Sequence, residues 1–202
     1  MRLKTLILAL LLVLSFVVPA EATEPMDALK KTISKVLSIL RDPVYKDGTK
    51  YHEQREKLKE VIATIFDYHE LSMRTLGVNW KKFSAPQQDE FSKAFADLLG
   101  SKYLDRIQSY ANEEVVYLAQ RDSSSGNVEI ATKVVKDNKD ISIAYRLAQT
   151  NGWRVYDVIV EGVSLVQNYR VQFQDMMVKG TPEELIVQVK KKAQEVDKGP
   201  KT

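Results

Sequence analysis

Apolar residues recur along the chain with two different periods, which divide it into helical and β segments. Between 25 and 110 they recur every three or four residues, the spacing of an amphipathic helix. This pattern predicts four helices, over 25–41, 49–66, 68–76 and 85–110. The charged run H-E-Q-R-E-K at 52–57 is expected to be solvated, and Gly100 interrupts the longest helix. That glycine indicates either a close approach by another segment or a tolerated helix defect.

Beyond residue 112 the period falls to two, which is typical of β-strands with one buried face. The alternation predicts strands over 113–120, 128–134, 141–148 and 153–160. The connecting turns are short, and Asn151-Gly152 has the sequence of a tight hairpin turn with positive φ. We therefore expect a four-stranded antiparallel meander.

The segment 153–173 links the sheet to a helix. Gly162 ends the last strand, and from Ser164 onward the apolar residues again follow helical spacing, predicting a helix over 165–179. The capping box Thr181–Glu184 begins a final helix. The pattern as a whole predicts an α+β fold in which about six helices cover a four-stranded antiparallel sheet.

Composition and charge exclude several classes of protein. The 202 residues suit a single domain, and 30 basic and 27 acidic residues are mixed along the chain, which argues against a nucleic-acid-binding protein. The chain has no cysteine, so disulfides and thiolate metal sites are excluded. Residues 1–22 have the basic start, apolar run and A-x-A end (Ala20-Glu21-Ala22) of a cleaved signal peptide. We expect one domain over 23–202, exported from the cytoplasm.

The sequence contains few of the residue patterns that are typical of catalytic sites. His52 and His69 are the only histidines, and neither has metal-ligand spacing. Asp157 is the exception, because it lies between apolar residues of a predicted strand, where aspartate is disfavoured. It is either a general base in an apolar pocket or a structural carboxylate that pairs with an arginine or caps backbone N–H groups.

The supply of apolar surface is large, since one sheet face and at least five helices all have apolar sides. This surface either builds one large core or lines a cavity between sheet and helices that is open to an apolar ligand. Periodicity alone leaves both interpretations open.

Four blocks resemble the MlaC family of periplasmic phospholipid carriers, the toluene-tolerance auxiliary proteins of ABC transporters in Gram-negative bacteria. They are F-D-Y-H-E-L-S-M-R-T-L-G-V-N-W (66–80), F-x-x-x-F-x-x-L-L-x-x-x-Y (91–103), W-R-V-Y-D-V-I-V-E-G-V-S-L-V (153–166) and N-Y-R-x-Q-F (168–173). Their order and spacing resemble the family along nearly all of the chain after the signal peptide.

The resemblance implies a nuclear-transport-factor-like fold with phospholipid tails in a hydrophobic cavity between sheet and helices. It also implies a periplasmic carrier without enzymatic activity or cofactor, whose cargo is phospholipid. Its implied partners are an outer-membrane lipoprotein–porin complex and the substrate-binding component of an inner-membrane ABC transporter.

Within this implied cavity we predict residues that contact the lipid. The expected tail-binding residues, taken from strand faces and helix stripes, are Leu76, Leu98, Leu99, Tyr103, Val134, Ile143, Tyr145, Leu147, Val158, Val160, Val163 and Leu165. Arg74 and Arg170 are candidates for contacting the head group; alternatively, they pair with Asp157 or Asp67. Two other functions stay open: an exported enzyme that uses Asp157 as general base, and a periplasmic chaperone for apolar segments.

Overall fold

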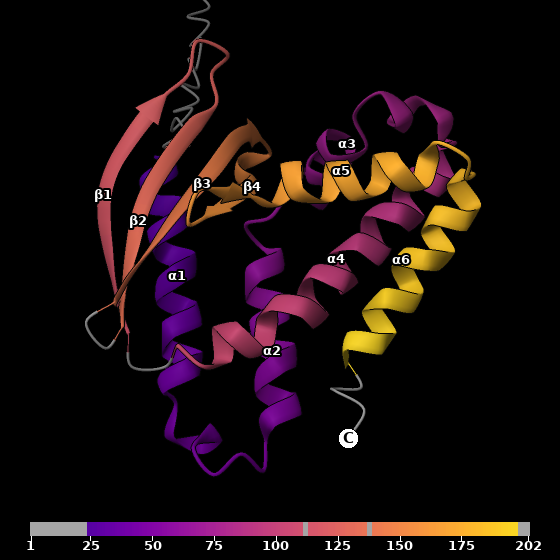
Figure 1. Ribbon diagram of the computed structural model, residues 1–202. Coiled ribbons are helices and arrows are strands. Elements are labelled where there is room, and N and C mark those ends of the chain that lie inside the picture. Colours follow the sequence, from indigo (N-terminus) through magenta and orange to yellow (C-terminus); the bar gives the residue numbers. More distant parts are fainter. Residues whose placement is uncertain (1–23, 111–112, 137–138, 198–202) are drawn as a thin grey trace, which may run out of the picture.

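The chain forms helices and one antiparallel sheet, the predicted α+β class (Figure 1). The computed structural model describes residues 24–110, 113–136 and 139–197. The predicted signal peptide, residues 1–22, lies outside these ranges. The α-helices of the described residues are α1 (Pro25–Arg41), α2 (Tyr51–Ala63), α3 (Tyr68–Leu76), α4 (Ala85–Gln108), α5 (Leu165–Met177) and α6 (Pro182–Asp197).

The strands pair in chain order, as expected for a meander. They are β1 (Glu114–Asp122), β2 (Val128–Lys136), β3 (Lys139–Thr150), β4 (Gly152–Val160) and β5 (Val163–Ser164). The short β5 was not predicted, because two residues carry no periodic signal. Register shifts at Leu118 in β1 and Tyr156 in β4 insert one extra residue each into the ladder.

The pairing register places the apolar positions of four strands on one side of the sheet, which we call the inner face. Residues directly opposite each other in a ladder share a face. The apolar and hydroxyl-bearing residues of the inner face are Val115, Tyr117, Val128, Ile130, Thr132, Val134, Ile141, Ile143, Tyr145, Leu147, Val155, Val158 and Val160. Gln120 and Asp122 of β1 lie on the same face, opposite Ile130 and Val128.

Helix α1 covers this inner face. Its Leu29 packs in one cluster with Val128 and Ile130. At its carboxyl end, Arg41 donates a hydrogen bond of 3.0 Å to the Glu113 carbonyl, while Lys30 lies 5.4 Å from the Tyr117 ring centroid. Helix α1 therefore runs antiparallel to β1, consistent with their positions in Figure 1.

A second core lies among the helices α3, α4, α5 and α6, away from the sheet. Its centre is a group of edge-to-face and tilted aromatic rings, with Phe91, Phe95 and Phe173 at centroid distances of 5.2–5.7 Å. The rings are almost fully buried. Helices α4 and α6 lie side by side along this core (Figure 1). Phe66 packs against both the sheet cluster and the helical one.

One local expectation was wrong. The charged start of α2 was predicted to be solvated, but Gln54 and Arg55 are buried. Arg55 forms an ion pair with Asp105 of α4 and donates to the Ser101 carbonyl at 3.4 Å. The sequence pattern did not reveal the burial of Arg55. A buried arginine is tolerated only when it has partners, and the partners of Arg55 lie 46 and 50 residues further along the chain.

Candidate functional site

The corner between β4 and α5 is held by Asp157, whose side chain is almost fully buried. Its Oδ2 accepts a hydrogen bond from the Ser164 hydroxyl at 2.7 Å and from Arg146 Nη1 at 3.3 Å. Its Oδ1 accepts from the Val166 backbone N–H at 3.1 Å. The structural interpretation of Asp157 is confirmed, since the carboxylate both pairs with an arginine and caps the first turn of α5.

These contacts leave Asp157 poorly suited to proton transfer. Both carboxylate oxygens already accept hydrogen bonds, and a general base needs a free oxygen within reach of a substrate proton. The alternative function, an exported enzyme that uses Asp157 as general base, therefore lacks a suitably placed base at this position.

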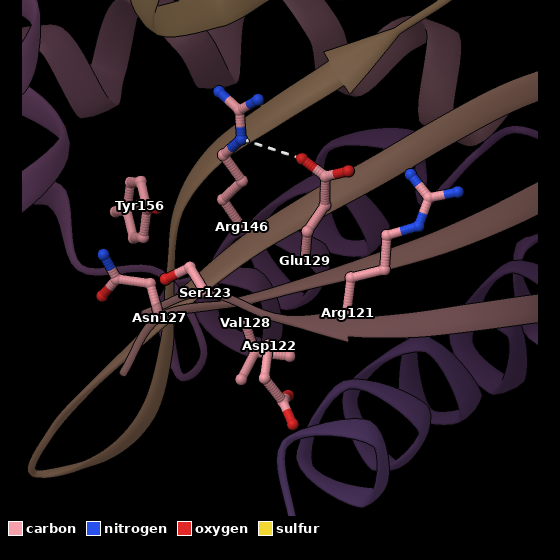
Figure 2. Close-up of a pocket in the computed structure, with 8 residues that line it drawn as sticks. All are labelled: Arg121, Asp122, Ser123, Asn127, Val128, Glu129, Arg146 and Tyr156. Atoms are coloured by element: carbon pink, nitrogen blue, oxygen red, sulfur yellow. Dashed lines mark hydrogen bonds and ion pairs between the residues drawn. The ribbon is translucent and has the colours of Figure 1, made fainter. Parts of the chain in front are cut away.

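A polar pocket of about 280 Å³ opens near the β1–β2 turn (Figure 2). Its lining residues are Arg121, Asp122, Ser123, Asn127, Val128, Glu129, Arg146 and Tyr156. Arg146 is held there by Glu129 at 3.0 Å and, behind it, by Asp157. Arg121, Glu129 and Arg146 lie opposite one another in the ladders and off the inner face. This pocket is charged and open, so it does not suit an acyl chain.

The inner face differs from the helical core in how completely it is covered. In the helical cluster, fully buried members outnumber partly exposed ones. In the sheet cluster the order is reversed, and the partly exposed members are Met26, Ala28, Ile33, Phe66, Ile143, Tyr145, Trp153, Val160 and Leu165. Contiguous apolar surface that stays partly exposed is characteristic of ligand-binding and interaction sites.

The structure brings some of the predicted tail-binding residues together on this surface. Val134, Ile143, Tyr145, Leu147, Val158 and Val160 share the inner face, and Leu165 packs against the same cluster. The pattern of strand alternation was sufficient to find them, because pairing keeps alternate residues on one face.

The other five predicted tail-binding residues lie elsewhere. Leu76, Leu98, Leu99 and Tyr103 belong to the helical cluster, and Val163 is 58% exposed at the start of β5. An amphipathic stripe shows that a helix face is covered, but not by which partner. These five residues therefore drop out of the tail site that we propose below.

The two arginines predicted for the head group also lie away from the inner face. Arg74 pairs with Glu70 at 2.7 Å and lies 4.0 Å from the ring centroid of Tyr156. Arg170 Nε donates to the Arg74 carbonyl at 3.1 Å, which ties α5 to α3. The alternative pairing with Asp157 was wrong, because Asp157 binds Arg146.

Asp67, the other suggested partner, instead caps α3. Its carboxylate accepts from the Glu70 backbone N–H at 2.9 Å. This agrees with the helix start and the cap expected from the sequence. The Gly77 backbone, at φ 55°, ends the same helix.

Two hydroxyl-bearing residues of the inner face, Tyr117 and Thr132, were missed by sequence reasoning, whereas Tyr145 was among the expected tail-binding residues. Tyr117 of β1 is directly opposite Thr132 of β2, and Tyr145 lies one row further along β3. Burial raises the pKa of Tyr145 to about 12, an effect that the nearby Tyr117 phenol increases and the Thr132 hydroxyl opposes. Burial also raises the pKa of Tyr117. The extra residue Leu118 breaks the alternation of β1, so its inward positions could not be read from the sequence.

No helix within 24–110, 113–136 and 139–197 is long and apolar enough to cross a membrane. In the same part of the chain, no group of three histidine, aspartate or glutamate side chains is placed to hold a metal ion.

Comparison with known proteins identifies the family. The family model described as "MlaC protein" matches residues 30–191, which includes most of α1, the whole sheet and the first ten residues of α6. The chain belongs to the MlaC family. The resemblance inferred from the four sequence blocks is thereby confirmed, and the match spans both the inner face and the helical core.

Curated relatives agree with this membership. The chain is 27% identical over 101 residues to the intermembrane phospholipid transport system binding protein MlaC of Haemophilus influenzae, a match that spans 47% of each chain. It is 22% identical over 159 residues to the toluene tolerance protein ttg2D of Pseudomonas putida, covering 77% of this chain and 74% of that protein. The chain thus matches about half the length of the first relative and about three quarters of the second.

A solved structure has the same fold. The phospholipid-binding protein of Ralstonia solanacearum, determined in complex with a phospholipid, superposes with a TM-score of 0.77 at 22% identity. The match covers 86% of this chain and 99% of that one. At this identity the likeness establishes the α+β fold.

Proposed function

We propose that this protein is a phospholipid carrier that holds acyl chains between the inner face of the sheet and α1. The incompletely covered apolar surface there is the observation that carries the proposal. Membership of the MlaC family supports it, as does the Ralstonia protein of the same fold, which was determined with a phospholipid. The proposed tail-binding residues are Val134, Ile143, Leu147, Val158, Val160 and Leu165, together with the ring, but not the hydroxyl group, of Tyr145.

The physics of lipid exchange explains why a carrier is useful. Two acyl chains contain about 30 methylene groups, and each costs roughly 0.8 kcal/mol to expose to water, about 24 kcal/mol in total. Spontaneous escape from a bilayer would then take on the order of a day. An apolar protein surface replaces one apolar environment with another, so the barrier falls while the end states stay nearly balanced.

We further propose that the carrier works in the periplasm, where it exchanges lipid with two membrane systems. The signal-peptide pattern of residues 1–22 supports export. The partners implied by the family are an outer-membrane lipoprotein–porin complex and the substrate-binding component of an inner-membrane ABC transporter. The name of the Haemophilus protein, which places it in an intermembrane phospholipid transport system, supports the same role here.

Neighbouring residues on opposite faces of β4 allow a matched test. Val160 and Ile159 are both partly exposed, but Val160 lies on the inner face and Ile159 does not. Val160→Trp adds bulk where we place the tails and should reduce transfer of a fluorescent phospholipid between vesicles at least fivefold. Ile159→Trp adds the same bulk on the other face and should leave transfer nearly unchanged.

The transfer rates separate the outcomes clearly. Equal rates for both variants and the original protein, with both variants folded by circular dichroism, would contradict the placement of the tails. Absence of transfer and of bound phospholipid in the original protein would contradict the carrier function itself. Peptide in place of lipid on the purified protein would indicate a chaperone instead.

A further inference from the structure

The inner face carries phenol groups that contribute nothing to an acyl-chain surface. Tyr117 and Tyr145 lie among apolar side chains, on adjacent rows of the sheet. In the described residues, neither phenol donates its proton to a carbonyl or carboxylate group. Thr132, between them, already donates its hydroxyl hydrogen to the Ile143 carbonyl at 3.0 Å. The Thr132 hydroxyl also interacts with the Tyr145 phenol, so the three hydroxyl groups form a polar group within a mostly apolar surface.

The two phenols are close enough to influence each other. The Tyr117 phenol raises the pKa of Tyr145, on top of the larger effect of burial. Both groups therefore stay protonated at neutral pH and act as neutral donors. A phenol donates one hydrogen bond, which the carbonyl oxygen of a ligand beside it can accept.

A cation lies next to this pair. Lys30, on the exposed side of α1, places its Nζ 5.4 Å from the Tyr117 ring centroid. The two arginines considered for the head group are instead bound at the α3–α5 contact, off the inner face. Lys30 is thus a cation at the margin of the apolar surface, beside edge strand β1.

We propose that Tyr117, Tyr145 and Lys30 form the polar end of the lipid site. This inference rests on the proposed carrier function. The phenols donate hydrogen bonds to the ester carbonyls that join acyl chains to glycerol, and Lys30 attracts the phosphate beyond them. A diacyl glycerophospholipid presents tails, esters and phosphate in this order, which matches the order of apolar face, phenols and lysine. The head group then emerges between α1 and β1.

Ether-linked phospholipids test the phenols directly, because they lack the ester carbonyls but keep tails and phosphate. The original protein should bind a dipalmitoyl phosphatidylglycerol about tenfold more tightly than its dihexadecyl ether analogue. The double variant Tyr117→Phe/Tyr145→Phe should bind both lipids equally. Tyr156→Phe, a matched change off the inner face, should keep the original preference.

A pair of variants at adjacent lysines of α1 tests the role of Lys30. Lys30→Gln should weaken binding of phosphatidylglycerol several-fold at low salt, and added sodium chloride should reduce this difference. Lys31, the next residue along α1, is also exposed, and Lys31→Gln should have little effect.

The outcomes distinguish this inference from the carrier function. If the original protein binds neither lipid, the carrier function is wrong. If it binds phospholipid but the ester preference is absent, or persists in the double variant, the polar end is misplaced while the carrier function stands. Should the double variant fold poorly, Tyr117→Phe alone, at the sheet edge, is expected to halve the preference at least.

Discussion

At the scale of single residues, Asp157 shows what a sequence can and cannot reveal. An aspartate between apolar strand residues is unusual, so its importance was visible from the sequence. The identity of its partners was not visible from the sequence. Arg146 is opposite Asp157 in a ladder whose register shifts at Tyr156, and Ser164 and Val166 reach it from the corner after β4. The carboxylate joins strand, corner and helix into one rigid connection.

The stability of this corner should depend on the charge of Asp157. Asp157→Asn replaces one acceptor oxygen by an NH2 group, so either Ser164 or Val166 loses its acceptor, and it removes the charge paired with Arg146. The free energy of unfolding in urea should fall by about 2–4 kcal/mol. Asp175→Asn, on the exposed side of α5, should change it by less than about 0.5 kcal/mol.

An unchanged unfolding curve for Asp157→Asn would show that the carboxylate is not a structural support. If that variant also lost an enzymatic activity, the view of Asp157 as general base would return.

At the scale of elements, helix boundaries followed closely from the sequence. Helices α1 and α3 match their predicted ranges, and the capping residues Ser84 and Gln87 begin α4 as expected. Local signals such as caps, prolines and apolar spacing act within a few residues, so they can be read directly. The partner of each helix face depends on the whole fold, so the sequence did not show that Leu98 and Leu99 pack in the helical cluster.

Gly100 illustrates the same distinction within α4. An added Cβ would lie 3.6 Å from Lys59 Cε and 3.7 Å from Leu104 Cδ1, which is ordinary contact. No segment therefore approaches too closely for alanine. Gly100→Ala should raise the free energy of unfolding by about 0.5–1 kcal/mol, because glycine is the poorer helix former.

The matched glycine at the end of α3 should respond in the opposite direction. Gly77 has φ 55° and ψ −125°, a conformation that other residues adopt only with strain. Gly77→Ala should therefore lower the free energy of unfolding by more than about 1 kcal/mol. A destabilising Gly100→Ala would mean that α4 packs more tightly there than the structure indicates.

At the scale of the whole molecule, the two larger of the three apolar clusters in the described residues have different roles. The helical cluster of α3 to α6 is tightly buried and aromatic, as befits a stable scaffold. The cluster between α1 and the sheet retains many partly exposed apolar side chains. A carrier needs both: one core that keeps the fold, and one apolar surface that can take up and release its cargo.

The sequence predicted the α+β class and the family at this scale, but not the division into two clusters. The sheet and the helices have enough apolar residues to build either a single core or the lining of a cavity. Only the pairing register and the packing of α1 separate the strand residues around Val158 from the helical residues around Leu98. The hydrophobic cavity expected between sheet and helices stays a prediction, which bound lipid would test.

The most direct measurement is native mass spectrometry of the mature protein, purified without detergent, followed by lipid extraction. We predict bound phospholipid at close to one molecule per chain. The amount of bound phospholipid should be much lower for Val160→Trp than for Ile159→Trp. A protein that is empty as purified and refuses added phospholipid would contradict the carrier function, leaving the resemblance to phospholipid-binding relatives as one of family and fold.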